Sequence, residues 1–102
     1  MYKVIIDDEA EKDLFHIFAY ICHCLMSPST AQTIYSNIKE AINSLAELPN
    51  RAPIIEKEPY SQEGVRKLLI KNYIAFYVVN EDSHEVHVLR VLYGKRDWRH
   101  LI

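Results

Sequence analysis

The sequence predicts an α+β fold, in which a hairpin of two helices packs on one face of a mainly antiparallel sheet. Residues 8–48 carry apolar side chains at steps of three and four, the spacing of amphipathic helices. Residues 65–93 hold three runs rich in β-branched and aromatic side chains, separated by short turns. One similar run, residues 2–7, precedes the helices, so the predicted order is β-α-α-β-β-β.

Length and composition predict one domain covering residues 1–102. The chain is 49% hydrophobic, enough for a packed core. Its apolar runs stay well below the roughly 20 residues that cross a bilayer. The acidic opening "MYKVIIDDEAEKD" lacks the apolar stretch of a signal peptide. We therefore expect a soluble cytoplasmic protein with no membrane segment.

The first helix is expected to begin at Asp8, because acidic residues crowd the first turn and favour a helix N-terminus. The second is expected to begin at Ser27 and Pro28, a suitable pair for the N-cap and first helical position, and to end before Pro49. So short a break between two helices predicts an antiparallel hairpin. Its interface with the sheet should include Leu14, Ile17, Ile34, Ile38, Leu45 and Tyr77.

Residues 49–64 are predicted to form a loop, since they contain three of the four prolines and one of the two glycines. The strands are expected at residues 65–71, 73–79 and 85–93, with turns at "KN" and "NEDSH". Cys22 and Cys24 are two apart and would point to different faces of a helix, which indicates reduced thiols. The histidines show no ligand spacing, and neither a metal nor another cofactor is predicted.

The charge is unevenly distributed along the chain. Residues 1–63 carry 5 Lys and Arg against 10 Asp and Glu, whereas residues 64–102 carry 7 against 4. Much of the positive charge lies in the last stretch, "VLRVLYGKRDWRH". This end of the molecule is expected to meet an anionic or target surface.

Over residues 2–98 the chain resembles the RelE/ParE superfamily, the toxins of type II toxin–antitoxin modules. The resemblance rests on "YKVIIDDEAEKDL", "AINSLAELPNRAP", "GVRKLLIKNYIAFYVV" and "VHVLRVLYGKRDW". It implies a toxin that a partner antitoxin neutralises. RelE-like members cleave mRNA in the ribosomal A site, whereas ParE-like members poison DNA gyrase. The sequence favours a ribosome-dependent mRNA endonuclease that uses no metal; the alternative is a ParE-like, non-enzymatic inhibitor of DNA gyrase.

Cleaving RNA without a metal requires a base, an acid and cations that stabilise charge on the phosphoryl oxygens. By resemblance, the catalytic candidates are Arg96, Lys67 and His100. The candidates for binding RNA or another target are Arg66, Lys71, Arg90, Tyr93, Lys95 and Arg99. Arg90 could instead pair with an acidic side chain, and Arg66 could tie down the preceding loop. Ile74 occupies the position at which nuclease members commonly have an arginine.

Overall fold

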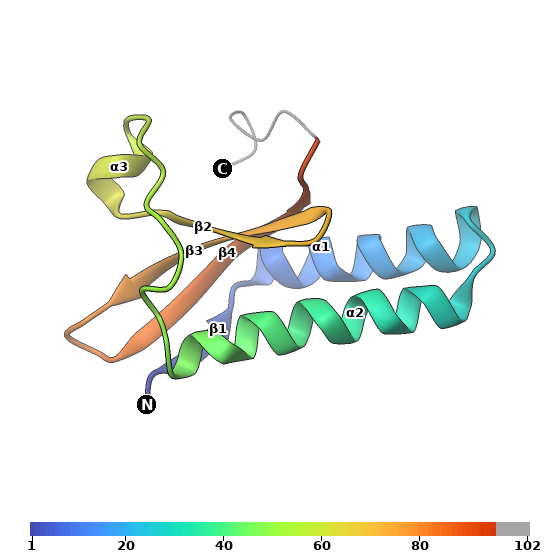
Figure 1. Ribbon diagram of the computed structural model, residues 1–102, viewed down its shortest axis with the longest axis horizontal. Coiled ribbons are helices and arrows are strands. Elements are labelled where there is room, and N and C mark those ends of the chain that lie inside the picture. Colours follow the sequence, from blue (N-terminus) through green and yellow to red (C-terminus); the bar gives the residue numbers. More distant parts are fainter. Residues whose placement is uncertain (96–102) are drawn as a thin grey trace.

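The computed structural model describes residues 1–95. Figure 1 shows two long antiparallel helices, α1 and α2, along one face of a four-stranded sheet, with the short helix α3 on the other side. The strands are β1 (Lys3–Ile6), β2 (Arg66–Ile70), β3 (Tyr73–Asn80) and β4 (Glu85–Tyr93). The helices are α1 (Asp8–Ala19), α2 (Pro28–Asn43) and α3 (Tyr60–Glu63). The predicted α+β fold and the order of its main elements are confirmed.

The sheet has the strand order β1-β4-β3-β2. Strand β1 runs parallel to β4, and the other neighbouring pairs are antiparallel. The register of β3 and β4 shifts at Phe76 and Tyr77, which indicates a β-bulge. Beyond Ile6 the chain leaves the sheet to start α1, whereas β4 continues to Tyr93.

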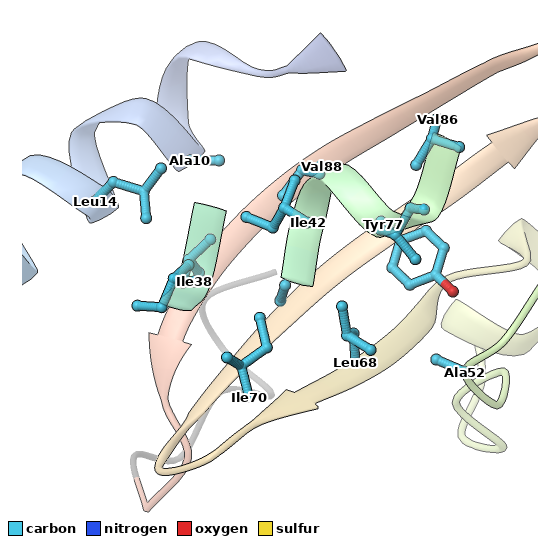
Figure 2. Close-up of a cluster of buried hydrophobic side chains, with 13 residues drawn as sticks. Ala10, Leu14, Ile38, Ile42, Ala52, Leu68, Ile70, Tyr77, Val86 and Val88 are labelled. Carbon is cyan, nitrogen blue, oxygen red and sulfur yellow. The ribbon is translucent and has the colours of Figure 1, made fainter. Parts of the chain in front are cut away.

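The main core lies between the helical hairpin and the sheet (Figure 2). Leu14 on α1 and Ile38 on α2 are 1% exposed, and they pack with alternating residues of the strands, as expected for one buried sheet face. Ile17 and Ile34 are partly buried against the same cluster. The predicted hairpin interface is therefore confirmed.

Tyr77 extends from this core toward the loop that follows α2 (Figure 2). Its ring is fully buried, and its hydroxyl donates a hydrogen bond of 2.8 Å to the carbonyl of Pro49. Burial is the main reason that its pKa is raised.

Replacing Tyr77 with phenylalanine should lower the free energy of unfolding by about 1–2 kcal/mol, because the Pro49 carbonyl loses its donor while the ring stays in place. Urea unfolding would measure the change. Tyr35→Phe is the control, since that half-buried tyrosine lies outside this contact. Equal stability of Tyr77→Phe and the unmutated chain would contradict the assigned hydrogen bond.

A second apolar cluster lies on the helix-free face, by which we mean the sheet face that the two long helices, α1 and α2, leave uncovered. It contains Ile55, Val65, Ile74, Phe76 and Leu92. Ile55 comes from residues 49–64, which were predicted as a loop, and Val65 directly follows them. That segment instead contains α3, which ends at Gly64 with φ of 71°, a left-handed conformation that glycine adopts readily. The segment therefore covers part of the sheet.

The helix boundaries differ from the predicted ones in two places. The first helix changes after Ala19 into a π-helical turn, Tyr20–Cys24, and the second ends in a 3₁₀ turn, Ser44–Ala46. Ser27 does stand before Pro28 at the N-cap, but its hydroxyl donates to the Thr30 hydroxyl at 2.7 Å and does not cap a backbone amide. None of the helices within residues 1–95 is long and apolar enough to cross a membrane.

Candidate functional site

Arg66 holds the segment between α2 and β2, which covers part of the sheet, against β2. Its guanidinium donates a hydrogen bond of 2.6 Å to the carbonyl of Ala52, which is buried. The backbone continues the same attachment, since Ile54 forms a bridge with Arg66. The side chain thus ties down the loop, the alternative that the sequence left open for it.

Arg90 is bound to α1 through the carboxylate of Asp13. Its Nε and Nη2 atoms donate to Asp13 at 2.7 and 2.9 Å, a two-point contact. The same carboxylate accepts the backbone N–H of Val91 at 3.0 Å. The hydrogen bond to Asp13 is also the main reason that the pKa of Arg90 is raised.

The position of Asp13 follows from the topology of the sheet. Strand β1 covers the β4 edge from Glu85 to Val88, and α1 runs past the remainder of that edge. A backbone N–H at such an edge needs an acceptor when it is buried. Asp13 is 9% exposed and supplies that acceptor for Val91. The Asp13 carboxylate therefore takes the place of a strand partner for the Val91 N–H.

Lys67 lies on the helix-free face, opposite Phe76 in the β2–β3 register. Its apolar neighbours on this face include the buried side chains of Ile74 and Phe76. A shallow cleft of about 510 Å³ opens farther along the same face and has three carboxylates in its lining, Glu63, Glu81 and Asp82. This combination of apolar and acidic side chains gives little support to a phosphate group.

The β2–β3 turn and the end of β4 bring together three of the predicted binding residues, Lys71, Tyr93 and Lys95. The N–H of Gly94 donates to the carbonyl of Asn72 at 2.7 Å, so the neighbouring Lys95 and Lys71 lie at one end of the sheet. A side-chain carbon at Gly94 would come within 3.1 Å of that carbonyl, which explains why glycine suits this close approach. Both lysines are exposed.

Aromatic rings complete this end of the sheet. Tyr93 is 40% exposed, and its ring meets that of Tyr73 edge-on at 5.8 Å. The pKa of Tyr73 is raised by burial first and then by Tyr93 and Tyr20. We call Lys71, Tyr73, Tyr93 and Lys95 the β-turn surface. It can offer both cationic and stacking contacts to a partner.

An apolar cleft of about 720 Å³ adjoins the β-turn surface, between the tip of the helical hairpin and the end of β4. Its lining includes Ile17 and Ile34 together with exposed Tyr20 and Leu25. The helical pattern of the sequence assigned Ile17 and Ile34 to the interface with the sheet. The π-helical turn and the exposure of the hairpin tip are features that this pattern did not indicate.

The remaining candidates, Arg96, Arg99 and His100, lie outside the described residues. Within residues 1–95, no group of three or more His, Cys, Asp and Glu side chains is arranged to hold a metal ion. Cys22 and Cys24 are free thiols.

Comparison with solved structures places the fold in the class of RelE/ParE superfamily toxins. The ParDE toxin–antitoxin system of P. aeruginosa matches with a TM-score of 0.76 and 23% identity, over 93% of this chain and 98% of the other. The RelBE2 complex of Mycobacterium tuberculosis matches with a TM-score of 0.69 and 19% identity, over 90% and 96%. The E. coli RelBE complex matches with a TM-score of 0.66 and 16% identity, over 94% and 100%.

The family model described as "ParE toxin of type II toxin-antitoxin system, parDE" matches residues 4–98. The chain belongs to this family and is a toxin of a type II toxin–antitoxin system. No curated protein matches the sequence.

Proposed function

We propose that this toxin inhibits growth by binding DNA gyrase and has no chemistry of its own. The observation that carries the proposal is the engagement of Arg66 and Arg90 within the fold, at 2.6 Å from the Ala52 carbonyl and 2.7 Å from the Asp13 carboxylate. A metal-independent nuclease needs several cations around one phosphate. Both side chains, which the sequence offered for binding RNA or another target, make these contacts within the protein, which supports the proposal.

Two further features support binding over catalysis. Ile74, at the position where nuclease members commonly have an arginine, is 7% exposed and packs in the second apolar cluster. The cleft farther along the same face is lined by Glu63, Glu81 and Asp82, whose negative charge would repel RNA. The membership of the ParE family points in the same direction.

The target-binding region in this proposal is the β-turn surface, and Arg96 and Arg99, which follow Lys95 in the sequence, are proposed to contribute to the same contact. Lysines and tyrosines at a protein interface favour association through charge steering and through large, rigid contact areas. A cognate antitoxin is the second proposed partner, since the P. aeruginosa and E. coli neighbours are parts of toxin–antitoxin systems. It would cover the exposed apolar side chains of the hairpin tip, Tyr20, Leu25 and Met26.

The deciding experiment compares two activities of the purified chain. One assay mixes it with gyrase and supercoiled plasmid and measures trapped double-strand breaks; the other mixes it with translating ribosomes and maps mRNA ends. We expect breaks that depend on gyrase, suppressed by the antitoxin, and intact mRNA. Ribosome-dependent mRNA cleavage without an effect on gyrase would overturn the proposal and establish the endonuclease instead.

The double variant Lys71→Ala/Lys95→Ala tests the β-turn surface. It should remain folded, because both side chains are exposed, and should require about three- to tenfold more protein for the same gyrase inhibition. The loss should shrink at high salt, where the charges are screened.

Lys57→Ala is the matched control, because it removes an exposed lysine from the segment between α2 and β2. Unchanged inhibition by the double variant, or an equal loss in the control, would exclude the β-turn surface as the contact region.

A further inference from the structure

A row of charged side chains joins β1 to β4 on the helix-free face. Strand β1 is four residues long and, within residues 1–95, pairs with β4 alone, with Lys3 opposite Glu85 and Ile5 opposite His87. Val86 and Val88 point into the main core, so the alternating residues Glu85 and His87 point to the other face. This edge strand leads directly into α1.

His87 lies between two carboxylates at equal distances. Its Nδ1 is 3.2 Å from Oδ1 of Asp7, and its Nε2 is 3.2 Å from Oε1 of Glu85. An ionised carboxylate only accepts hydrogen bonds, and a neutral imidazole has one donor and one acceptor nitrogen. Only the imidazolium form can therefore donate to both partners. Loss of its proton leaves a nitrogen lone pair facing a carboxylate.

The neighbouring charges favour the same protonation state. Ser83 donates a hydrogen bond to Glu85 at 3.2 Å, and the Lys3 ammonium also stabilises the Glu85 carboxylate, whose pKa is lowered mainly by His87. The shallow cleft that contains His87 is further lined by the carboxylates Glu63, Glu81 and Asp82. Glu63 comes from α3, and Glu81 and Asp82 come from the β3–β4 turn, whereas the charged side chain that β1 contributes is Lys3, opposite Glu85.

We propose that His87 is a pH-dependent latch, which holds β1 and the start of α1 against β4 while protonated and loosens this edge on losing its proton. The latch acts where the chain turns from strand to helix, since Asp7 is the N-cap of α1 and its amide donates to the Val88 carbonyl at 2.9 Å. The Lys3 amide donates to the His84 carbonyl at 2.9 Å, at the other end of the β1–β4 ladder.

The direction of the pH dependence follows from the pKa of His87, which the hydrogen bonds to Glu85 and then Asp7 raise above 6.5. A group whose pKa is raised by folding stabilises the folded edge fully below its ordinary pKa. That contribution disappears as the pH rises through the raised value. Opening would then leave the β4 edge from Glu85 to Val88 without its partner, a surface available for pairing with another strand.

Hydrogen exchange followed by NMR on the full chain tests the latch. We expect the protection of the Lys3 and Asp7 amides, corrected for base catalysis, to fall about three- to tenfold between about pH 5 and about pH 9. His87→Gln should remove this dependence, and His23→Gln, at an exposed position on the hairpin tip, should retain it. A pH dependence that survives in His87→Gln, or none in the unmutated chain, would overturn the proposal.

A second variant keeps the test valid if His87→Gln folds poorly. Asp7→Asn removes one of the two acceptors of the imidazolium, so the pKa of His87, followed through its ring protons, should fall. A purely structural role of Asp7 would leave that titration in place. An unchanged His87 titration in Asp7→Asn would therefore refute the two-carboxylate latch.

Discussion

Replacing Asp13 with alanine should lower the free energy of unfolding by about 3–5 kcal/mol, the usual cost of removing one partner of a buried ion pair. The Asp13 side chain is 10% exposed and that of Arg90 is 20% exposed. The variant would remove the two-point acceptor of the Arg90 guanidinium and the carboxylate that accepts the buried Val91 N–H. Urea unfolding monitored by circular dichroism would give the change.

A matched ion pair on the same helix provides the control. Lys12 and Glu9 are 3.3 Å apart, and their side chains are 66% and 63% exposed. Glu9→Ala should change stability by no more than about 0.5 kcal/mol, because water screens an exposed pair. Asp13→Asn should lie between the two alanine variants, since its amide oxygen can still accept the Val91 N–H. An Asp13→Ala loss as small as that of Glu9→Ala would show that the contact contributes little.

The role of Asp13 could not be read from its place in the sequence. It lies near the middle of α1, so the helical pattern alone suggests an exposed polar position. The sequence offered Asp97, Glu81 and the acidic first turn of the helix as partners for Arg90, but not Asp13 in particular. Which acidic side chain pairs with Arg90 depends on where β1 ends and where α1 passes β4, and these are properties of the tertiary structure.

The overall fold was predictable because it depends on local patterns. Apolar spacing along both helices and alternation along the strands each identify one buried face, and Leu14, Ile38 and Tyr77 occupy that face as expected. The edge position of β1 and its parallel pairing with β4 depend on contacts between distant residues. No short-range pattern encodes such a pairing.

The candidate site was less predictable, since a basic side chain has the same appearance in sequence whether it binds a target or the protein itself. Lys71 and Lys95 are exposed at one end of the sheet, whereas Arg66 reaches back to the loop before β2. Longer side chains on strands can contact either the fold or its surroundings. The close approach of Gly94 to the Asn72 carbonyl, beside the two lysines, exists only once the strands and the turn have formed, so the sequence alone does not show it.

Replacing Phe76 with alanine should lower the free energy of unfolding by about 3–5 kcal/mol, because a fully buried aromatic ring is removed and leaves a cavity. Phe76 is 0% exposed and lies in the second cluster, where Ile55 and Val65 cover part of the helix-free face. The same face would need to be accessible in a nuclease that stacks a base on the strand. The size of the stability loss therefore also indicates how fully Phe76 is shielded from solvent on this face.

Leu69→Ala is the control for this prediction, because Leu69 is an alternating neighbour of Lys67 on the same face of β2 yet is 67% exposed. Its substitution should change stability by no more than about 0.5 kcal/mol. Phe76→Leu should cost less than Phe76→Ala, since most of the apolar volume remains. If Phe76→Ala instead unfolded at the same urea concentration as Leu69→Ala, Phe76 would be accessible, and an open helix-free face would again favour the ribosome-dependent nuclease over the gyrase inhibitor.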